Sequence, residues 1–325
     1  MQPIVVGLDG SPSSAAALRW ALGAALAGRA ELLLVSVVPD GADAQLIELA
    51  MLREWAGQVQ ASGVPFRTEV VEGVPGPALN AVSAGVGDCL VVVGQGHDRW
   101  FPALHLGSAS HYLAHHVERP LCVVPRGHEL FDPSHIVVGL DGSPGSMAAA
   151  RWAADLATRS GGKATAVYAW QHSTPKMTNV VTGPDTGVDA DLACRTWASA
   201  LDEAGILTEA QAVEGEPVKV LAATVAAAGA GLVVLGTGSG VRPGVRLGSV
   251  ALRVLGLGDV PVVLVPPSPR HSSPMLTQES SCIARKRSGS FPYLRTQRPD
   301  WEHVQNPNGV GETWTLHELP CWCAP

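Results

Sequence analysis

A nine-residue segment occurs twice in this 325-residue chain and strongly limits the folds available to it. Residues 4–12 and residues 136–144 both read IVVGLDGSP, and an alanine-rich segment containing Arg-Trp-Ala follows each copy. Each copy runs from a short apolar strand through a glycine-bearing acidic turn into a helix. This duplication predicts two domains of the same fold, one after the other along the chain.

Apolar runs alternate with helical segments throughout the first repeat. The expected strands are residues 4–6, 31–38, 66–71, 89–93 and 121–124, and the expected helices are residues 15–27, 44–62, 77–86 and 107–117. In the first helix, Leu18, Leu22 and Leu26 are expected on one face. Strands separated by helices predict a parallel sheet with helices on both faces and right-handed crossovers. We therefore expect two doubly wound, Rossmann-like α/β domains of five strands each.

The second repeat follows the same plan with one insertion. The segment Glu72-Gly73-Val74-Pro75 returns as Glu214-Gly215-Glu216-Pro217 at an offset of 142, whereas the nonapeptide returns at an offset of 132. The extra residues fall between about 172 and 191, where Thr, Pro, Gly and Asp predict a surface loop. We expect domains over residues 1–126 and 134–267. Residues 268–325 lose the alanine-rich helices and valine runs, which predicts a disordered tail.

Composition excludes several classes of function. The formal net charge of −7 gives no basic surface for nucleic acid. No run approaches the roughly 18 apolar residues that span a bilayer, and the first strand follows Pro3 without a signal peptide, so we expect a cytoplasmic protein with no membrane partner. Cys89, Cys122 and Cys194 are expected to be reduced core thiols. Cys321-Trp322-Cys323 has no second Cys/His pair at metal-binding spacing.

Three turns in each repeat are expected to form a ligand site. In an open parallel sheet, ligands bind beyond the carboxyl ends of the strands, where the strand order reverses. The first turns supply Asp9, Gly10 and Ser11, and Asp141, Gly142 and Ser143; the ends of the second strands supply Val37 and Ala169. The segments after the fourth strands supply Gly94, Gly96, Gly107 and Ser108, and Gly236, Gly238, Gly248, Ser249 and Val250.

The glycine segments after the fourth strands suit a phosphate group. Glycine lets the main chain approach an anion closely, and a Gly-Ser pair at a helix start offers N–H groups, a hydroxyl and the positive end of the helix dipole. Arg99, Arg242 and Arg246 lie in the same loops and would add positive charge. The alternative is that these glycines only make tight turns between strand and helix.

The Asp-Gly-Ser first turn, the Glu-Gly-x-Pro element and the Gly…Gly-Ser loop resemble the universal stress protein family in its tandem-domain form. The resemblance covers residues 1–126 and 134–267. It implies ATP binding, with Asp9 and Asp141 at the adenosine, Val37 and Ala169 along the adenine, and the glycine loops around the phosphates. It also implies that fifth strands pair edge to edge, here residues 121–124 with 262–265 as an internal pseudo-dimer, and it is compatible with a homodimer.

Both glycine loops depart from the pattern of the ATP-binding members, which is Gly-x-x-Gly, nine residues, then Gly-Ser or Gly-Thr. In the first loop His97 stands at the second glycine position, and in the second loop one residue is missing before Gly248. A histidine hinders close approach of the main chain. The second domain is therefore expected to be the better nucleotide site.

Other chemistries find little support. The sequence has neither a Walker A motif nor a Gly-x-Ser-x-Gly nucleophile elbow, and the first turns lack a dinucleotide fingerprint. His111 and His115 have helical i, i+4 spacing but no third ligand, so no metal site is expected. Asp9 or Asp141 could hold Mg²⁺ beside a triphosphate but has no general base as partner. We expect no catalytic residues and at most weak ATP hydrolysis.

The sequence thus predicts an adenine-nucleotide-binding sensor or regulator that acts on an unidentified protein partner. The alternative is an interaction module of the same fold that binds no nucleotide. An adenylate-forming or nucleotide-hydrolysing enzyme would need a Ser-Gly-Gly-x-Asp-type loop, which the sequence lacks.

Overall fold

The computed structural model describes residues 2–39, 55–96, 106–116, 118–171, 187–238 and 247–267. All of these residues belong to one compact unit, Met1–Thr277. Among the helices that they form, none is both long enough and apolar enough to cross a membrane.

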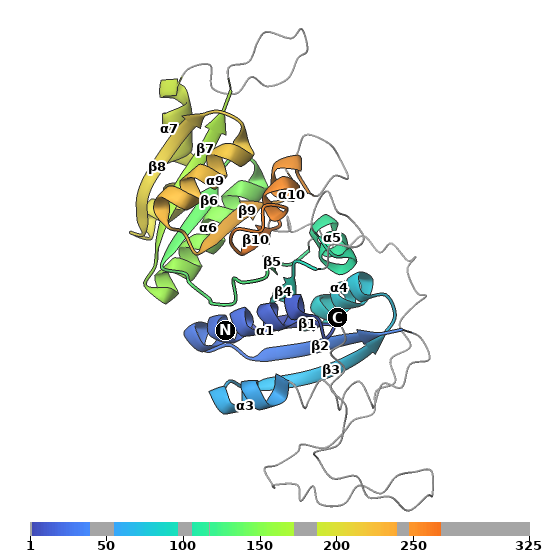
Figure 1. Cartoon of the computed structure of the whole chain (residues 1–325). Helices are drawn as coiled ribbons and strands as arrows, with labels where there is room; N and C mark the ends of the chain where they lie inside the picture. The colour runs from blue at the N-terminus through green and yellow to red at the C-terminus, as the bar shows by residue number, and fades with distance from the viewer. Residues whose placement is uncertain are drawn as a thin grey trace, which may run out of the picture. The chain divides into compact units, whose positions relative to one another are not determined.

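The first domain is the expected five-stranded parallel sheet (Figure 1). Its strands are β1 (Ile4–Leu8), β2 (Leu32–Val38), β3 (Phe66–Glu72), β4 (Leu90–Gly94) and β5 (Leu121–Val124). Its described helices are α1 (Pro12–Gly28), α3 (Gly57–Ser62), α4 (Pro75–Val86) and α5 (Ser108–His115). The strand order β3-β2-β1-β4-β5 reverses direction between β1 and β4, which creates the crevice where ligands of such sheets bind.

The second domain repeats this topology in the order β10-β9-β6-β7-β8. Its strands are β6 (His135–Gly139), β7 (Lys163–Trp170), β8 (Leu207–Glu214), β9 (Leu232–Gly236) and β10 (Val262–Val265). Its described helices are α6 (Pro144–Ser160), α7 (Gly187–Trp197), α8 (Ser199–Glu203), α9 (Pro217–Ala228) and α10 (Ser249–Leu255). Both halves therefore confirm the doubly wound α/β prediction.

The two sheets join into one sheet of ten strands because β5 and β10 pair antiparallel. Cys122 lies opposite Val263, and both side chains are fully buried. This is the edge-to-edge pairing that the family resemblance implied. It satisfies main-chain groups that would otherwise form two exposed sheet edges.

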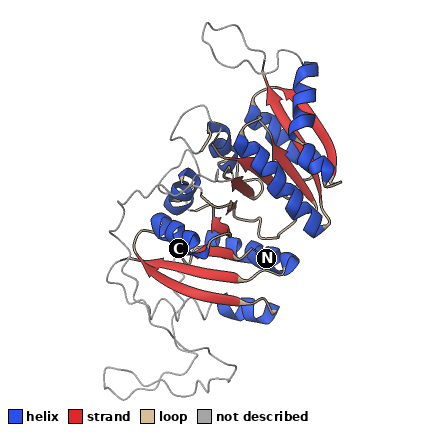
Figure 2. Cartoon of the chain, turned by 180° about the vertical axis from the view of Figure 1, so that it is seen from behind, coloured by secondary structure: helices blue, strands red, loops and turns tan. Residues whose placement is uncertain are grey.

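Helices cover both faces of this sheet, as the view from behind also shows (Figure 2). Successive residues of β1 alternate between two apolar clusters: Val6 packs in the cluster that contains Trp20 of α1, and Val5 packs in the cluster that contains Leu79 of α4. The continuous apolar runs of the central strands follow from burial on both faces.

The first helix of each domain begins with the same cap. The hydroxyl of Ser11 accepts a hydrogen bond from the Ser14 N–H, and the hydroxyl of Ser143 accepts one from the Ser146 N–H, each at 3.1 Å. A proline follows each capping serine, at a position where its missing N–H costs no helical hydrogen bond. The repeated Ser-Pro dipeptide thus fixes where both helices start.

The leucine face of α1 is only partly buried: Leu18 is 1% exposed and Leu26 is 52% exposed, whereas alanines such as Ala17, Ala21 and Ala25 are buried. One prediction of local structure was wrong. The loop expected up to residue 191 ends earlier, since α7 begins at Gly187 and carries Asp189 in its first turn, where an acidic side chain stabilises a helix. Residues 44–54 of the expected second helix, residues 172–186 and the tail lie outside the described residues.

The buried Gln95 side chain joins the two domains, and replacing it with alanine is expected to destabilise the protein. Its Nε2 donates a hydrogen bond to the Leu255 carbonyl at the end of α10, at 3.0 Å. Loss of this bond leaves the Leu255 carbonyl without this partner at the buried contact between the domains. Gln95→Ala should therefore lower the free energy of unfolding by about 1–2 kcal/mol in chemical denaturation. Gln58→Ala, at an exposed glutamine of α3, is the control; equal effects of the two changes would contradict this role.

Candidate functional site

The acidic turns have the same geometry in both domains. The Asp9 carboxylate accepts a hydrogen bond from the Ser11 N–H at 3.0 Å, and the Asp141 carboxylate accepts one from the Ser143 N–H at 2.9 Å. Gly10 and Gly142 have φ angles of +78° and +74°, which glycine adopts at little cost. Both aspartates and both glycines are exposed, so each turn presents a carboxylate at the surface beyond the strand end.

The ends of the fourth strands pack directly on the first turns of α1 and α6. A Cβ atom at Gly94 would lie 2.4 Å from the Ser13 carbonyl oxygen, and one at Gly236 would lie 2.1 Å from the Gly145 carbonyl carbon. No larger residue fits at either position without a main-chain shift. This packing by itself accounts for Gly94 and Gly236, and it brings each glycine segment against the helix that follows the acidic turn.

The remaining glycines differ between the two domains. Gly96 has a φ of +99°, a Cβ there would lie 2.3 Å from the Gly107 Cα, and the Gly107 N–H donates to the Gln95 carbonyl at 2.7 Å. In the second domain Gly238 also has a positive φ, of +74°, but no described atom lies within 4 Å of a Cβ placed at Gly248. The first site is therefore tightly packed at its glycines, whereas Gly248 faces space that the described residues leave open.

The helices after these segments begin without a side-chain cap. Gly107 and Gly248 are the N-cap residues of α5 and α10, and among the described residues no side chain accepts a hydrogen bond from either first turn. This contrasts with α1 and α6, which the serines of the first turns cap. Ser108 and Ser249 are exposed beside these N–H groups. The arrangement suits an acceptor supplied from outside the chain.

Sheet register aligns the second-strand residues with the acidic turns. Leu8 pairs with Ser36 and Gly139 pairs with Val167. Continuing the first register by one residue puts Asp9 level with Val37, and continuing the second by two residues puts Asp141 level with Ala169. Val37 and Ala169 are partly buried against the apolar cluster under α4, α5, α9 and α10. Each site therefore joins a carboxylate, uncapped main-chain N–H groups and a small apolar side chain.

An aromatic pair beside the second acidic turn was not predicted. The Tyr168 and Trp197 rings meet edge to face with centroids 5.0 Å apart, and Trp197 lies so close that a Cβ at Gly142 would be 2.5 Å from its Cζ2. Burial raises the pKa of Tyr168, and the nearby Asp141 charge adds to the effect. The first repeat has Ser36 in place of Tyr168, which the offset of 132 would have revealed. The two sites therefore have different surroundings.

Several side chains considered from the sequence lie outside the described residues: His97, Arg99, Arg242 and Arg246. His111 and His115 do approach each other, with ring centroids 4.6 Å apart. Burial lowers the pKa of His115, and the neighbouring His111 and His116 lower it further. Within the described ranges, no group of three His, Cys, Asp or Glu side chains is arranged to hold a metal ion.

The three described cysteines are buried free thiols, as predicted. Burial raises the pKa of Cys89 and of Cys194 to about 11, and it raises the pKa of Cys122 well above its ordinary value. A thiol with such a pKa is protonated at neutral pH and is a poor nucleophile. These cysteines therefore contribute to packing.

Comparison with known proteins identifies a family that matches both repeats. A family model described as the universal stress protein family matches residues 1–125 and 133–266. A universal stress protein of Mycobacterium tuberculosis strain H37Rv is 30% identical over 310 residues, which cover 80% of this chain and 94% of the relative. Another universal stress protein of the same strain is 29% identical over 190 residues, covering 51% of this chain and 63% of the relative.

Solved structures share the fold at lower sequence identity. A universal stress protein from Archaeoglobus fulgidus DSM 4304 superposes with a TM-score of 0.62 at 19% identity, covering 82% of this chain and 98% of that chain. A protein from Pseudomonas aeruginosa UCBPP-PA14, described as a putative universal stress protein, gives the same TM-score and identity and covers 82% of this chain and 94% of that one.

Proposed function

This chain belongs to the universal stress protein family, and we propose that it binds an adenine nucleotide, ATP in the first place, as a sensor or regulator in the response to stress. The proposed sites are the carboxyl ends of β1 and β4 in the first domain and of β6 and β9 in the second. We propose that the second site binds the nucleotide with the higher affinity.

The observation that carries this proposal is the contrast between capped and uncapped helix starts. A serine side chain accepts one first-turn N–H in each of α1 and α6, whereas the described residues supply no side-chain acceptor to α5 and α10. Main-chain N–H groups and a neighbouring hydroxyl are suitable partners for phosphate oxygens. The contrast occurs in both repeats.

The residues of each site fit the parts of a nucleotide. Asp141 offers a carboxylate for a ribose hydroxyl or for Mg²⁺ beside the phosphates, and Ala169 offers a small apolar surface for the base. Gly248, Ser249 and Val250 would receive phosphate through their N–H groups. Asp9, Val37, Gly107 and Ser108 form the corresponding set in the first domain. ATP would be the charged ligand that these groups bind.

Signalling would follow from the change that bound nucleotide makes in the surface that a partner protein recognises. The described residues at the two sites include no nucleophile paired with a general base, so at most slow hydrolysis of ATP is expected. The proposed role is binding, not turnover.

One observation favours an interaction module without nucleotide, at least for the first domain. Packing alone requires glycine at two positions of its site, because a Cβ at Gly94 would clash with Ser13 and a Cβ at Gly96 would clash with Gly107. The first domain would then support the second and bind no nucleotide.

Nucleotide extraction from freshly purified full-length protein tests the proposal. We expect adenine nucleotide at up to about one equivalent per chain, because the second site is the more open, identified by ion-exchange chromatography after acid precipitation. Protein carrying Gly248→Trp, purified in parallel, should yield much less. If gentle purification releases no nucleotide and added MgATP does not bind, the interaction module becomes the better account.

A further inference from the structure

An apolar groove lies between α9 and α10 in the second domain, beside the amino ends of β9 and β10. The proposed nucleotide sites lie at the carboxyl ends of the strands, so this α9 groove belongs to neither of them. Its floor contains buried apolar side chains, among them Leu221, Val233, Val254 and Val262. Its volume of about 320 Å³ lies within the range of pockets that bind small molecules.

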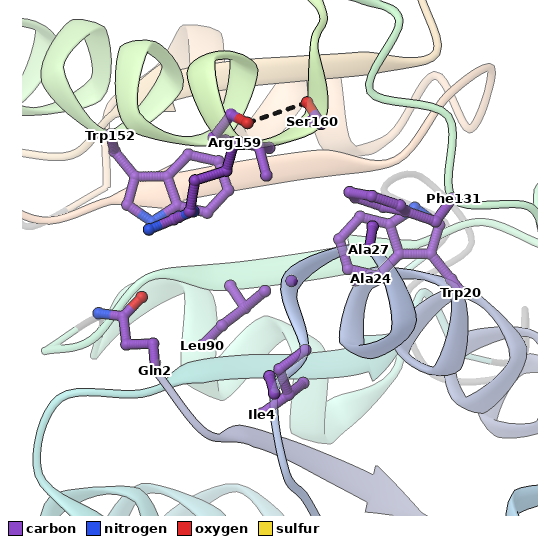
Figure 3. Close-up of a pocket in the computed structure, with 13 residues that line it drawn as sticks. Gln2, Ile4, Trp20, Ala24, Ala27, Leu90, Phe131, Trp152, Arg159 and Ser160 are labelled. Carbon is purple, nitrogen blue, oxygen red and sulfur yellow. Dashed lines mark hydrogen bonds between the residues drawn. The ribbon is translucent and has the colours of Figure 1, made fainter. Parts of the chain in front are cut away.

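Another cavity, between α1 and α6, is too small for such a ligand. Trp20, Phe131 and Trp152 lie around it (Figure 3), and its volume is about 70 Å³. An apolar cavity that takes up benzene has a volume of roughly 150 Å³, more than twice as large. Of these two cavities, therefore, only the α9 groove has room for a small organic molecule.

The first repeat shows what occupies the same place in the other domain. The residues before β5, Glu118-Arg119-Pro120, return before β10 as Asp259-Val260-Pro261. Arg119 is partly buried, and its Nε–H donates a hydrogen bond to the carbonyl of Gly87, the residue that caps the end of α4. The residue that caps the end of α9 is Gly229, which lines the groove. The first domain thus places its own guanidinium group against the equivalent helix end.

The second domain has no side chain that repeats this contact. Val260 stands at the position of Arg119, and a valine side chain carries no hydrogen-bond donor. Ala222 of α9, in the wall of the groove, likewise stands at the position of Asn80 of α4. These two differences leave an apolar space beside the end of α9. The carboxyl end of a helix carries partial negative charge, which favours a cation in that space.

A carboxylate adds negative charge to the wall of the groove. Asp259 lines the groove and is exposed, and no described residue forms an ion pair or a hydrogen bond with its carboxylate. Leu257 also lines the groove and is 43% exposed, so apolar surface lies close to this charge. In pockets of this kind a few polar groups fix the orientation of a mainly apolar ligand. The α9 groove therefore favours a ligand with an apolar body and a positive group.

From these contacts we propose that the α9 groove binds a small molecule in which an apolar body carries a guanidinium group. The apolar body lies on the floor of the groove. The guanidinium group lies between the Asp259 carboxylate and the Gly229 carbonyl, as that of Arg119 lies at Gly87 in the first domain. This proposal does not depend on nucleotide binding, because the groove and the nucleotide sites lie at opposite ends of the strands.

Fluorine NMR with two matched probes tests the charge preference on the full-length protein. The probes are 4-fluorobenzylguanidinium and 4-fluorobenzylurea, which has nearly the same shape but no charge. The guanidinium should bind in the millimolar range and about fivefold more tightly than the urea. Asp259→Asn keeps the size of the side chain and removes its charge, so this preference should largely disappear. Asp202→Asn, at an exposed aspartate of α8 outside the groove, should leave the preference unchanged.

Three further variants show whether the probes lie in the groove. Ala223 and Ala226 are both exposed alanines of α9, but only Ala226 lines the groove. Ala226→Leu should therefore weaken both probes about tenfold, whereas Ala223→Leu should leave both affinities unchanged. Val260→Arg introduces the side chain that the first domain has and should weaken the guanidinium probe by a similar factor.

Three results would overturn the proposal. The first is that the guanidinium probe does not bind at about 10 mM, or that Asp259→Asn leaves its preference over the urea unchanged. The second is that neither Ala226→Leu nor Val260→Arg weakens it. The third is a dimer in light scattering that Ala226→Leu converts to a monomer, because a second copy of the chain would then occupy the groove.

Discussion

Replacing Gly236 with alanine is expected to lower the free energy of unfolding by about 3 kcal/mol, the largest stability effect that we predict for a single methyl group. The added Cβ would lie 2.1 Å from the Gly145 carbonyl carbon and 2.2 Å from the Ser146 nitrogen. Both contacts are with main chain in the first turn of α6, which the Ser143 cap holds in place. The clash therefore cannot be relieved by rotation of a side chain.

Chemical denaturation followed by circular dichroism measures this loss. Gly85→Ala is the matched control, because Gly85 lies within α4 and no described atom is within 4 Å of the added methyl group. There, alanine should keep or raise the stability through its better helix propensity. If the two variants are equally stable, the close approach of β9 to α6 is not required by the fold.

Replacing Gly248 with tryptophan is expected to weaken MgATP binding at least tenfold with little change in stability. No described atom is within 4 Å of a Cβ at this position, so the indole enters the space proposed for phosphate without disturbing the described core. Isothermal titration of the full-length variant measures the affinity. A tenfold loss corresponds to about 1.4 kcal/mol of binding free energy.

The control for this change is Gly57→Trp, at a position on α3 that is equally open but belongs to neither site. Gly107→Trp tests the first site. Since a Cβ at Gly107 would lie 3.0 Å from the Gly96 Cα, this variant should also lose stability. An affinity of Gly248→Trp equal to that of Gly57→Trp would place the nucleotide elsewhere.

The alternation of strands and helices and the doubly wound fold class followed from the sequence, because they depend on local patterns. Apolar runs bounded by glycine predicted β1 and β6, and the Ser-Pro dipeptides predicted where α1 and α6 start. The carboxyl ends of parallel strands necessarily meet at one edge, so the acidic turns and glycine segments had to lie near each other.

The structural details that the sequence did not predict depend on distances between segments far apart in the chain. Leu26 fits a leucine stripe on a helical wheel, but the close approach of α1 to the sheet selects alanines for the buried face. The contact of Trp197 with Gly142 joins residues 55 positions apart and depends on where α7 ends. The packing role of Gly94 likewise appears only when β4 and α1 are placed together. Local sequence does not encode such distances directly.

The central claim is that main-chain N–H groups at the glycine segments receive the nucleotide. Selective ¹⁵N labelling of the 36 glycines of the full-length chain gives a direct measurement by NMR, with signals assigned through single glycine variants. On addition of MgATP, the account predicts that the amide signal of Gly248 shifts most, while Gly161 and Gly229, at the far ends of α6 and α9, keep their positions. A titration in which Gly248 and Gly107 do not move, or in which only Gly161 and Gly229 move, would contradict it.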